Sequence, residues 1–335
     1  MQIGNLARAG FGATSDGMWP YSYSACDVGT LANQTYPNAT SPITAFTSGL
    51  AGFNGSLSYQ PGQRASACTC PSDSTSHPGP SVAVGRGAPE VDILEAQVSL
   101  LPDGALGGTV SQSAQFAPYD AGYEPLNVTG GRVLRGQGTY ANSYVGQVYQ
   151  EAVSAVSPTD ARAYELGGRG FASYGVETWP GGAGRPEEGF MTWQVGSRET
   201  WTLNAAAVGP NAETEIGQRL VSQEPMVRRR RSARGRQSPG LCGAGADLGV
   251  HPSPPCAAQY LILNLAMSQG FETIDLANLQ FPARMFVDYV RVYQRAGEVH
   301  VGCDPAGHPT SDYISNHENA YSNGALLLHF WCTRP

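Results

Sequence analysis

Residues 90–100 read Glu-Val-Asp-Ile-Leu-Glu-Ala-Gln-Val-Ser-Leu, and this stretch decides the fold. Apolar and polar side chains alternate along most of it, so Val91–Leu100 is predicted to be a half-buried β-strand. A second alternating stretch, Val110–Ala117, predicts a second strand. Gly104, Gly107 and Gly108 lie between the two and predict a turn.

Alternation and a high content of Val, Ile, Leu and Tyr predict further strands along the chain. They are Phe190–Val195 and Thr200–Ala206, read as a hairpin around Gly196, and later Tyr260–Ser268 and Met285–Gln294. Tyr144–Ala155 carries the single helical pattern. With 42 glycines, 24 prolines and only 14% charged residues, the chain is predicted to be an all-β sandwich or barrel.

Bulk properties exclude several classes of protein. The formal net charge of −7 over 335 residues argues against nucleic acid as the partner. No run of about 18 apolar residues would span a membrane. The histidines have no ligand spacing and no C-x-x-C pair occurs, so we expect neither a metal nor a cofactor.

Two features place the chain in the secretory pathway. Four N-glycosylation sequons lie at Asn33, Asn38, Asn54 and Asn127, whereas a chain of this size often carries one or two by chance. Seven cysteines favour disulfides. The candidates join Cys26 and Cys303 to Cys68 and Cys70, with the connectivity open.

One segment does not fit the pattern of strands and turns. Val227–Gln259 runs through four arginines, Arg228–Arg231, into Ala, Gly, Pro and Ser without periodicity. The arginines have no aromatic partners, which argues against nucleic-acid binding. A processing site or a disordered loop would fit, and a retained intron of GC-rich codons is our preferred interpretation. Pro71–Pro89 has the composition of a long surface loop.

Three carboxylates give residues 90–95 their chemistry. In a regular strand Glu90 and Asp92 share one face while Glu95 points to the other. A β-bulge at Ile93-Leu94 would insert one residue and return Glu95 to the face of the other two acids. Two carboxyl groups about 5–5.5 Å apart are what a retaining glycosidase needs. Crowded like charges would keep the acid protonated near neutral pH. The alternative is an ordinary solvated acidic face of a strand.

Aromatic side chains support a sugar site, because sugar rings stack on flat apolar faces. Ordinary core packing is the alternative for each of them. The aromatic residues that would frame a cleft are Trp19, Trp179, Trp193, Tyr119 and Tyr123. Of these, Trp19, Trp193 and Tyr119 are the candidate substrate-binding residues.

Several stretches make the sequence recognisable. Glu90–Glu95 resembles the E-x-D-x-x-E signature of glycoside hydrolase family 16, and Ile262–Ala266 and Val287–Gln294 resemble two later strands of that fold. One branch, the fungal β-1,6-glucan synthesis-associated membrane proteins, is more similar still, over about residues 3–322 apart from the insert. The stretches that carry this likeness are Gly4–Thr14, Asp16–Tyr23, Cys26–Thr30, Ala67–Pro71, Ser111–Asp120 and Gly302–Pro305.

The resemblance implies a concanavalin A-like jelly-roll β-sandwich, incomplete at its N-terminus. It implies Glu90 as nucleophile, Asp92 as its partner and Glu95 as acid/base, with Trp19, Trp193 and Asn264 lining or supporting the cleft. It also implies a type II membrane protein of the secretory pathway, with a lumenal domain that works on cell-wall β-glucan. The transmembrane helix of that family would lie outside this chain.

The resemblance leads to further expectations. The family domain is predicted to cover residues 1–322, interrupted by 227–259, with an aberrant tail over 323–335. Because the chain begins inside that domain, we expect it to expose strand edges and to fold poorly. Two functions stay open: a retaining glycoside hydrolase or transglycosylase acting on β-glucan, and a catalytically silent protein that binds or scaffolds β-glucan chains.

Overall fold

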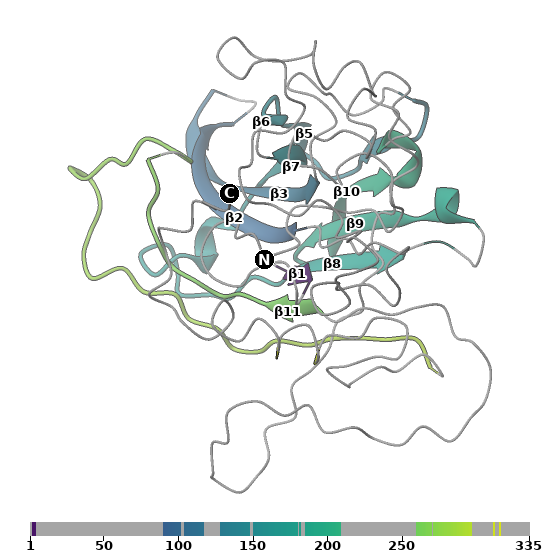
Figure 1. Ribbon diagram of the computed structural model, residues 1–335. Helices are drawn as coiled ribbons and strands as arrows, with labels where there is room; N and C mark the ends of the chain where they lie inside the picture. The colour runs from purple at the N-terminus through teal and green to yellow at the C-terminus, as the bar shows by residue number, and fades with distance from the viewer. Residues whose placement is uncertain are drawn as a thin grey trace, which may run out of the picture.

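The computed structural model describes eleven parts of the chain, in which nearly all the regular structure is β. These parts are residues 2–4, 90–101, 104–116, 128–147, 150–179, 181, 185–208, 259–269, 271–296, 311 and 315. Their strands form two antiparallel sheets, which Figure 1 shows as arrows at the centre of the molecule.

The larger sheet carries the carboxylates. Its strands follow the order β11-β1-β2-β3-β7-β5, and β6 also pairs with β7. The bounds are β1 Gln2–Gly4, β2 Glu90–Leu100, β3 Leu106–Phe116, β5 Tyr140–Ala141, β6 Gly146–Gln147, β7 Gln150–Pro158 and β11 Gln259–Leu261. The long strands β2, β3 and β7 form its centre, so a side chain on β2 has its cross-strand neighbours on β3.

The smaller sheet has the order β4-β10-β9-β8. Its strands are β4 Arg132–Leu134, β8 Tyr174–Trp179, β9 Phe190–Val195 and β10 Arg198–Asn204. Short 3-10 turns occupy Ala161–Ala163, Pro186–Glu188 and Ala205–Ala207. In the described part of the chain, no helix is long and apolar enough to cross a membrane.

The hydrophobic core lies between the two sheets. The larger sheet contributes Val91, Ala114, Val153 and Ala155, and the smaller sheet contributes Met191, Trp193, Trp201 and Leu203. The rings of Trp193 and Trp201 stack with centroids 4.1 Å apart and planes 2° apart. Apolar faces of two sheets packed on each other define a β-sandwich. The all-β sandwich is therefore confirmed, and its jelly-roll topology stays a prediction.

Four of the predicted strands are confirmed with small shifts of their ends: β2, β3, β9 and β10. The hairpin between β9 and β10 turns at Gly196, whose φ is 66°, a value that glycine adopts without strain. Of the three glycines predicted to turn between β2 and β3, only Gly104 does so, with φ 81°. Gly107 and Gly108 lie inside β3 instead.

The predicted helix over Tyr144–Ala155 is wrong, because the segment contributes to strands β6 and β7. Its alanines tolerate a helix, but Ala152, Ser154 and Ala155 pair with β3. Local propensity is a weak prior, and the ladder offered by β3 overrides it.

The two late strands are also largely wrong. Of the first, only Tyr260 and Leu261 belong to a strand, β11, and Met285–Gln294 forms none. Alternation fixes which side chains would share a face, but a strand also needs a neighbouring edge to bond. In the described segment 271–296 side chains such as Phe286 and Tyr289 are exposed, with 63% and 54% of their surface accessible.

Candidate active site

A β-bulge places all three acids on one face of β2. Asp92 pairs with Ser113 and Glu95 pairs with Ser111, so Ile93 and Leu94 together stand opposite the single residue between those two serines. The extra residue shifts the alternation by one position, which returns Glu95 to the face of Asp92. The bulge predicted at Ile93-Leu94 is therefore confirmed.

Asp92 is held by donors from the neighbouring strand β3. Ser113 Oγ donates to Asp92 Oδ2 at 2.9 Å, and Gln115 Nε2 donates to the same oxygen at 3.1 Å. Gln115 Nε2 also donates to Ser113 Oγ at 3.0 Å. With only 1% of its surface accessible, the carboxyl group of Asp92 is fixed by charge-assisted hydrogen bonds.

Glu95 is the acid whose protonation the fold changes. Burial, together with the negative charges of Asp92 and Glu90, raises the pKa of Glu95 to about 8. A carboxyl group with this pKa is protonated at neutral pH and can donate a proton. Glu90 is buried and pairs with Gln115 across the ladder. Its carboxyl group lies on the same face of β2 as those of Asp92 and Glu95.

Two further polar groups lie on this face and were missed by sequence reasoning. Ser154 on β7 pairs with Ser113, and Gln115 lies beside Asp92. Among the described residues, Ser154 Oγ and Gln115 Oε1 are buried polar atoms without a hydrogen-bond partner. Such atoms are rare in folded proteins. The alternation of polar residues at 111, 113 and 115 was the available signal.

Trp193 contacts the backbone of β2, the strand of the three acids, and does not line the surface of the molecule. Its side chain has no accessible surface and stacks within the core, where its Nε1 donates to the backbone carbonyl of Asp92 at 3.0 Å. The expectation that its ring faces a substrate is thus corrected, because the ring lies between the sheets. Asn264 is exposed in the segment after β11. Trp179 is half-buried at the end of β8 under Arg295, whose guanidinium lies 3.9 Å from the ring centroid.

The other predicted features lie outside the described residues. They are Trp19, Tyr119 and Tyr123, the sequons at Asn33, Asn38, Asn54 and Asn127, the cysteines Cys26, Cys68, Cys70 and Cys303, the loop Pro71–Pro89, the insert up to residue 258 and the tail 323–335. Where the structure describes the chain, no group of His, Cys, Asp and Glu could hold a metal ion.

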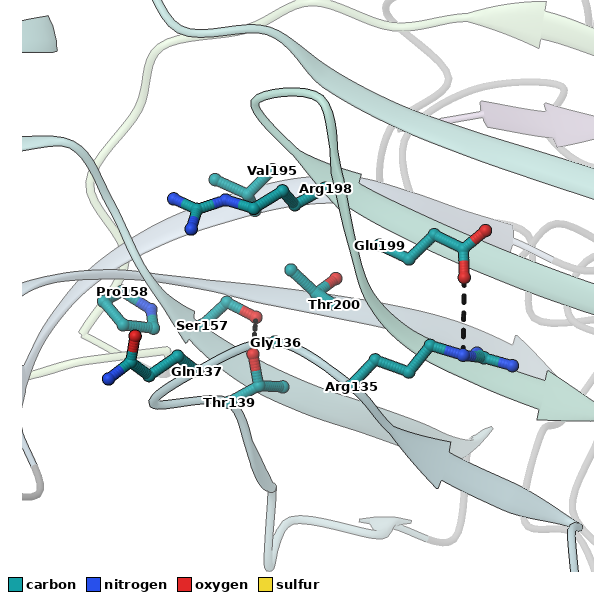
Figure 2. A pocket seen from close by; sticks show the side chains of 10 residues that line it. All are labelled: Arg135, Gly136, Gln137, Thr139, Ser157, Pro158, Val195, Arg198, Glu199 and Thr200. Carbon is teal, nitrogen blue, oxygen red and sulfur yellow. Dashed lines mark hydrogen bonds and ion pairs between the residues drawn. The ribbon is translucent and has the colours of Figure 1, made fainter.

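A pocket of about 650 Å³ opens elsewhere in the sandwich (Figure 2). Arg135, Arg198 and Glu199 contribute charged side chains, and Thr200 and Ser157 contribute hydroxyls. Arg135 Nε lies 3.3 Å from a carboxylate oxygen of Glu199, so that acid is already paired with a cation. None of the three acids of β2 lines this pocket, and its residues include no acid pair for glycoside chemistry.

Comparison with known proteins identifies the family of the chain. The family model described as β-glucan synthesis-associated protein SKN1/KRE6/Sbg1 matches residues 1–228 and 253–330. The chain therefore belongs to this family. The unmatched residues 229–252 fall inside the segment set apart by its composition, and the match extends to residue 330, past the start of the predicted tail.

Individual relatives show the same likeness. The chain is 36% identical over 327 residues to the β-glucan synthesis-associated protein KRE6 of Saccharomyces cerevisiae, covering 97% of this chain and 36% of the relative. It is 35% identical over 323 residues to the β-glucan synthesis-associated protein SKN1 of Candida albicans, covering 96% and 35%. The chain thus spans about a third of the length of these relatives. No solved structure matches it.

Proposed function

We propose that this chain takes part in fungal cell-wall β-glucan synthesis as a retaining glycosidase or transglycosylase that uses Glu90, Asp92 and Glu95. One observation carries the proposal: the bulge in β2 gathers the three acids on one face, and there Glu95 has a pKa of about 8. A protonated acid beside further carboxyl groups is the arrangement that retaining glycoside chemistry requires.

In the first step the carboxylate of Glu90 attacks the anomeric carbon of a glucosyl unit. The bond to the leaving oxygen breaks, its electron pair stays on that oxygen, and the proton comes from Glu95. Asp92, fixed by Ser113 and Gln115, orients Glu90 from the same face. The product is a covalent glucosyl ester of Glu90.

The second step reverses the proton transfer. Esterification removes the negative charge of Glu90, which is one of the causes that raise the pKa of Glu95. The now ionised Glu95 accepts a proton from a water molecule or a sugar hydroxyl, whose oxygen attacks the anomeric carbon and releases Glu90. Water gives hydrolysis, and a sugar hydroxyl gives transfer of one chain to another.

The proposed substrate class rests on the relatives. Their names associate them with β-glucan synthesis, so β-glucan chains are the proposed partners. Placement in the lumen of the secretory pathway belongs to the same proposal, and the four N-glycosylation sequons of the sequence support it. A glucan-binding scaffold is the second candidate, because those names speak of association with synthesis and not of cleavage.

Trapping the covalent intermediate tests the enzyme against the scaffold. The chain is incubated with a β-glucosyl donor that carries fluorine at C2 and a good leaving group, then digested and analysed by mass spectrometry. We expect the glucosyl mass on the peptide that contains Glu90, and none on the peptide of Glu90→Gln. A folded parent that binds β-gluco-oligosaccharides but gains no label would favour the scaffold.

A further inference from the structure

Gln112 lies opposite the bulge, with its side chain on the core side of β3. Asp92 pairs with Ser113 and Glu95 with Ser111, so Gln112 is the single β3 residue that faces Ile93 and Leu94. Its side chain has no accessible surface. A long amide in the core between two sheets needs a reason, because buried polar groups destabilise a fold unless they are hydrogen-bonded.

Each hydrogen-bonding group of the Gln112 amide contacts a defined partner. Nε2 donates to the carbonyl oxygen of Ile93 at 3.0 Å and to that of Gln194 at 3.2 Å. Oε1 accepts from Thr200 Oγ at 2.7 Å. Two carbonyls on one side and a hydroxyl on the other allow a single orientation of the amide, since a flipped one would set oxygen against oxygen.

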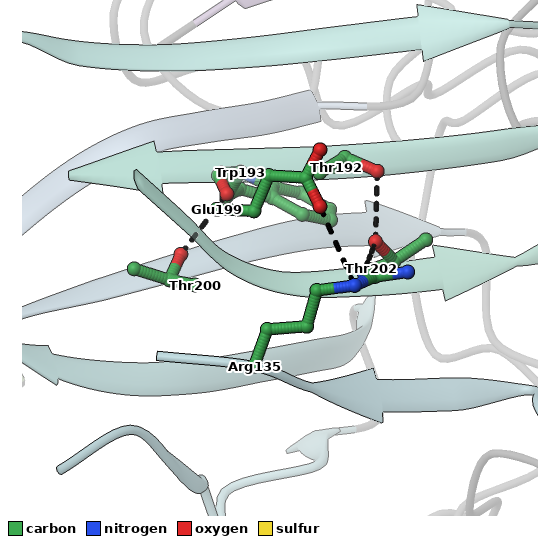
Figure 3. Close-up of polar contacts among 6 residues, drawn as sticks. All are labelled: Arg135, Thr192, Trp193, Glu199, Thr200 and Thr202. Atoms are coloured by element: carbon green, nitrogen blue, oxygen red, sulfur yellow. Dashed lines mark hydrogen bonds and ion pairs between the residues drawn. The ribbon is translucent and has the colours of Figure 1, made fainter. Parts of the chain in front are cut away.

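The smaller sheet completes the support of the bulge. Thr200 Oγ also lies 3.1 Å from the carbonyl oxygen of Trp193, which Figure 3 shows as a dashed line between β10 and β9. Trp193 Nε1 in turn donates to the carbonyl oxygen of Asp92. Two successive carbonyls of β2, those of Asp92 and Ile93, therefore accept hydrogen bonds from buried side chains of other strands. A bulge disrupts the ladder locally, and these side chains supply partners where it does so.

We infer that Gln112 is a positioning residue of the proposed site, which holds the β2 bulge from inside the core and so keeps Glu95 on the face of Glu90 and Asp92. Without the bulge, the alternation of β2 would return Glu95 to the opposite face. The residue acts through the backbone of Ile93 and touches none of the three carboxyl groups by the contacts described above. The inference rests on the proposed function for its catalytic meaning, but the geometry it concerns can be measured without substrate.

The test is a titration of Glu95 in the full chain by carbon NMR, with glutamate labelled at the side-chain carboxyl. A spectrum of Glu95→Gln identifies the resonance of Glu95 by its absence. The parent is expected to titrate near pH 8. In Gln112→Met the bulge loses the hydrogen bonds of the Gln112 amide. The midpoint of Glu95 should then fall by about one unit or more toward the ordinary value, because Glu95 leaves its half-buried place beside the other acids.

Thr192→Val is the matched control. Thr192 Oγ lies 2.8 Å from Thr202 Oγ in the smaller sheet, so the variant loses a buried hydroxyl contact without touching the bulge (Figure 3). Its Glu95 midpoint should stay that of the parent even where its stability falls. If Gln112→Met does not fold, Gln112→Asn replaces it, and the same fall in the Glu95 midpoint is expected. The shorter side chain of asparagine cannot donate to the carbonyl oxygens of both Ile93 and Gln194.

A parental midpoint in a folded Gln112 variant would overturn the inference. A lowered midpoint in Thr192→Val as large as that in the Gln112 variant would also overturn it, since the effect would then follow from lost stability alone. Failure of the chain to label at Glu90 would instead reject the proposed function. The two failures are distinguishable, because the titration uses no sugar.

Discussion

Glu95 and Asp92 share one face of β2 although they are three positions apart, because two residues of β2 stand opposite one residue of β3. In a regular strand a separation of three places side chains on opposite faces. The bulge therefore creates the electrostatic contact that helps to raise the pKa of Glu95. Several measurable properties follow from this one irregularity.

Stability should fall with rising pH because of Glu95. Its pKa is about 8 in the folded chain and near the ordinary 4.5 when unfolded, so between these values the folded state holds more protons. The free energy of unfolding then decreases with pH, by at most about 1.4 kcal/mol per unit for one group. Urea denaturation from pH 5 to 8 should show this slope in the parent and a flatter one in Glu95→Gln. Equal slopes would contradict the raised pKa.

The activity should depend on pH through the same group. Cleavage or transfer of β-gluco-oligosaccharides needs Glu95 protonated, so the rate should decline as pH rises through about 8, by about tenfold per unit well above it. A β-glucoside whose leaving group needs no proton should show no such decline in its first step. If both substrates lose activity in parallel, Glu95 is not the acid.

The two stacked tryptophans should differ in their effect on stability. Trp193 Nε1 donates to the carbonyl of Asp92, whereas the buried Trp201 Nε1 has no partner among the described residues. Both changes to Phe reduce ring volume, but only Trp193→Phe also removes a buried hydrogen bond, and such a bond contributes about 0.5–1.5 kcal/mol. Urea denaturation should therefore rank Trp193→Phe as the less stable variant. The reverse order would show that the hydrogen bond to β2 contributes little.

Ser113 and Asp92 should be energetically coupled. Ser113 Oγ donates to Asp92 Oδ2, and a hydrogen bond to a charged group contributes about 1.5–3 kcal/mol. In a double-mutant cycle of Ser113→Ala and Asp92→Ala, the two losses of unfolding free energy should add to more than the loss in the double variant. Additivity to within about 0.5 kcal/mol would argue against the contact.

The sandwich was predictable where one sheet face is buried. In β9, for example, the buried residues Met191 and Trp193 are two positions apart, which is the apolar periodicity of a strand in the sequence. The prediction of secondary structure failed in segments whose structure depends on pairing with a neighbouring strand. Tyr144–Ala155 has a composition that tolerates a helix, and Met285–Gln294 alternates without being a strand in the structure. The sequence shows the alternation of apolar and polar side chains, but it does not show whether a neighbouring strand is available for pairing.

The site was predictable in part for a related reason. The spacing of Glu90, Asp92 and Glu95 in one strand makes the bulge necessary if the acids are to act together, and the ladder shows that bulge. The support from Gln112 and Trp193 was not predictable, because it joins strands of different sheets through contacts between residues 82 and 101 positions apart. Such contacts exist only after the sheets have packed.

The most direct test of the account is mass spectrometry of β-1,3- and β-1,6-gluco-oligosaccharides incubated with the chain, with Glu90→Gln and Glu95→Gln run in parallel. The account predicts shortened or lengthened oligosaccharides from the parent and unchanged ones from Glu90→Gln. Lengthened products would indicate transfer, and shortened products alone would indicate hydrolysis. Unchanged oligosaccharides from a folded parent that still binds them, or equal processing by Glu90→Gln, would contradict catalysis by these carboxylates.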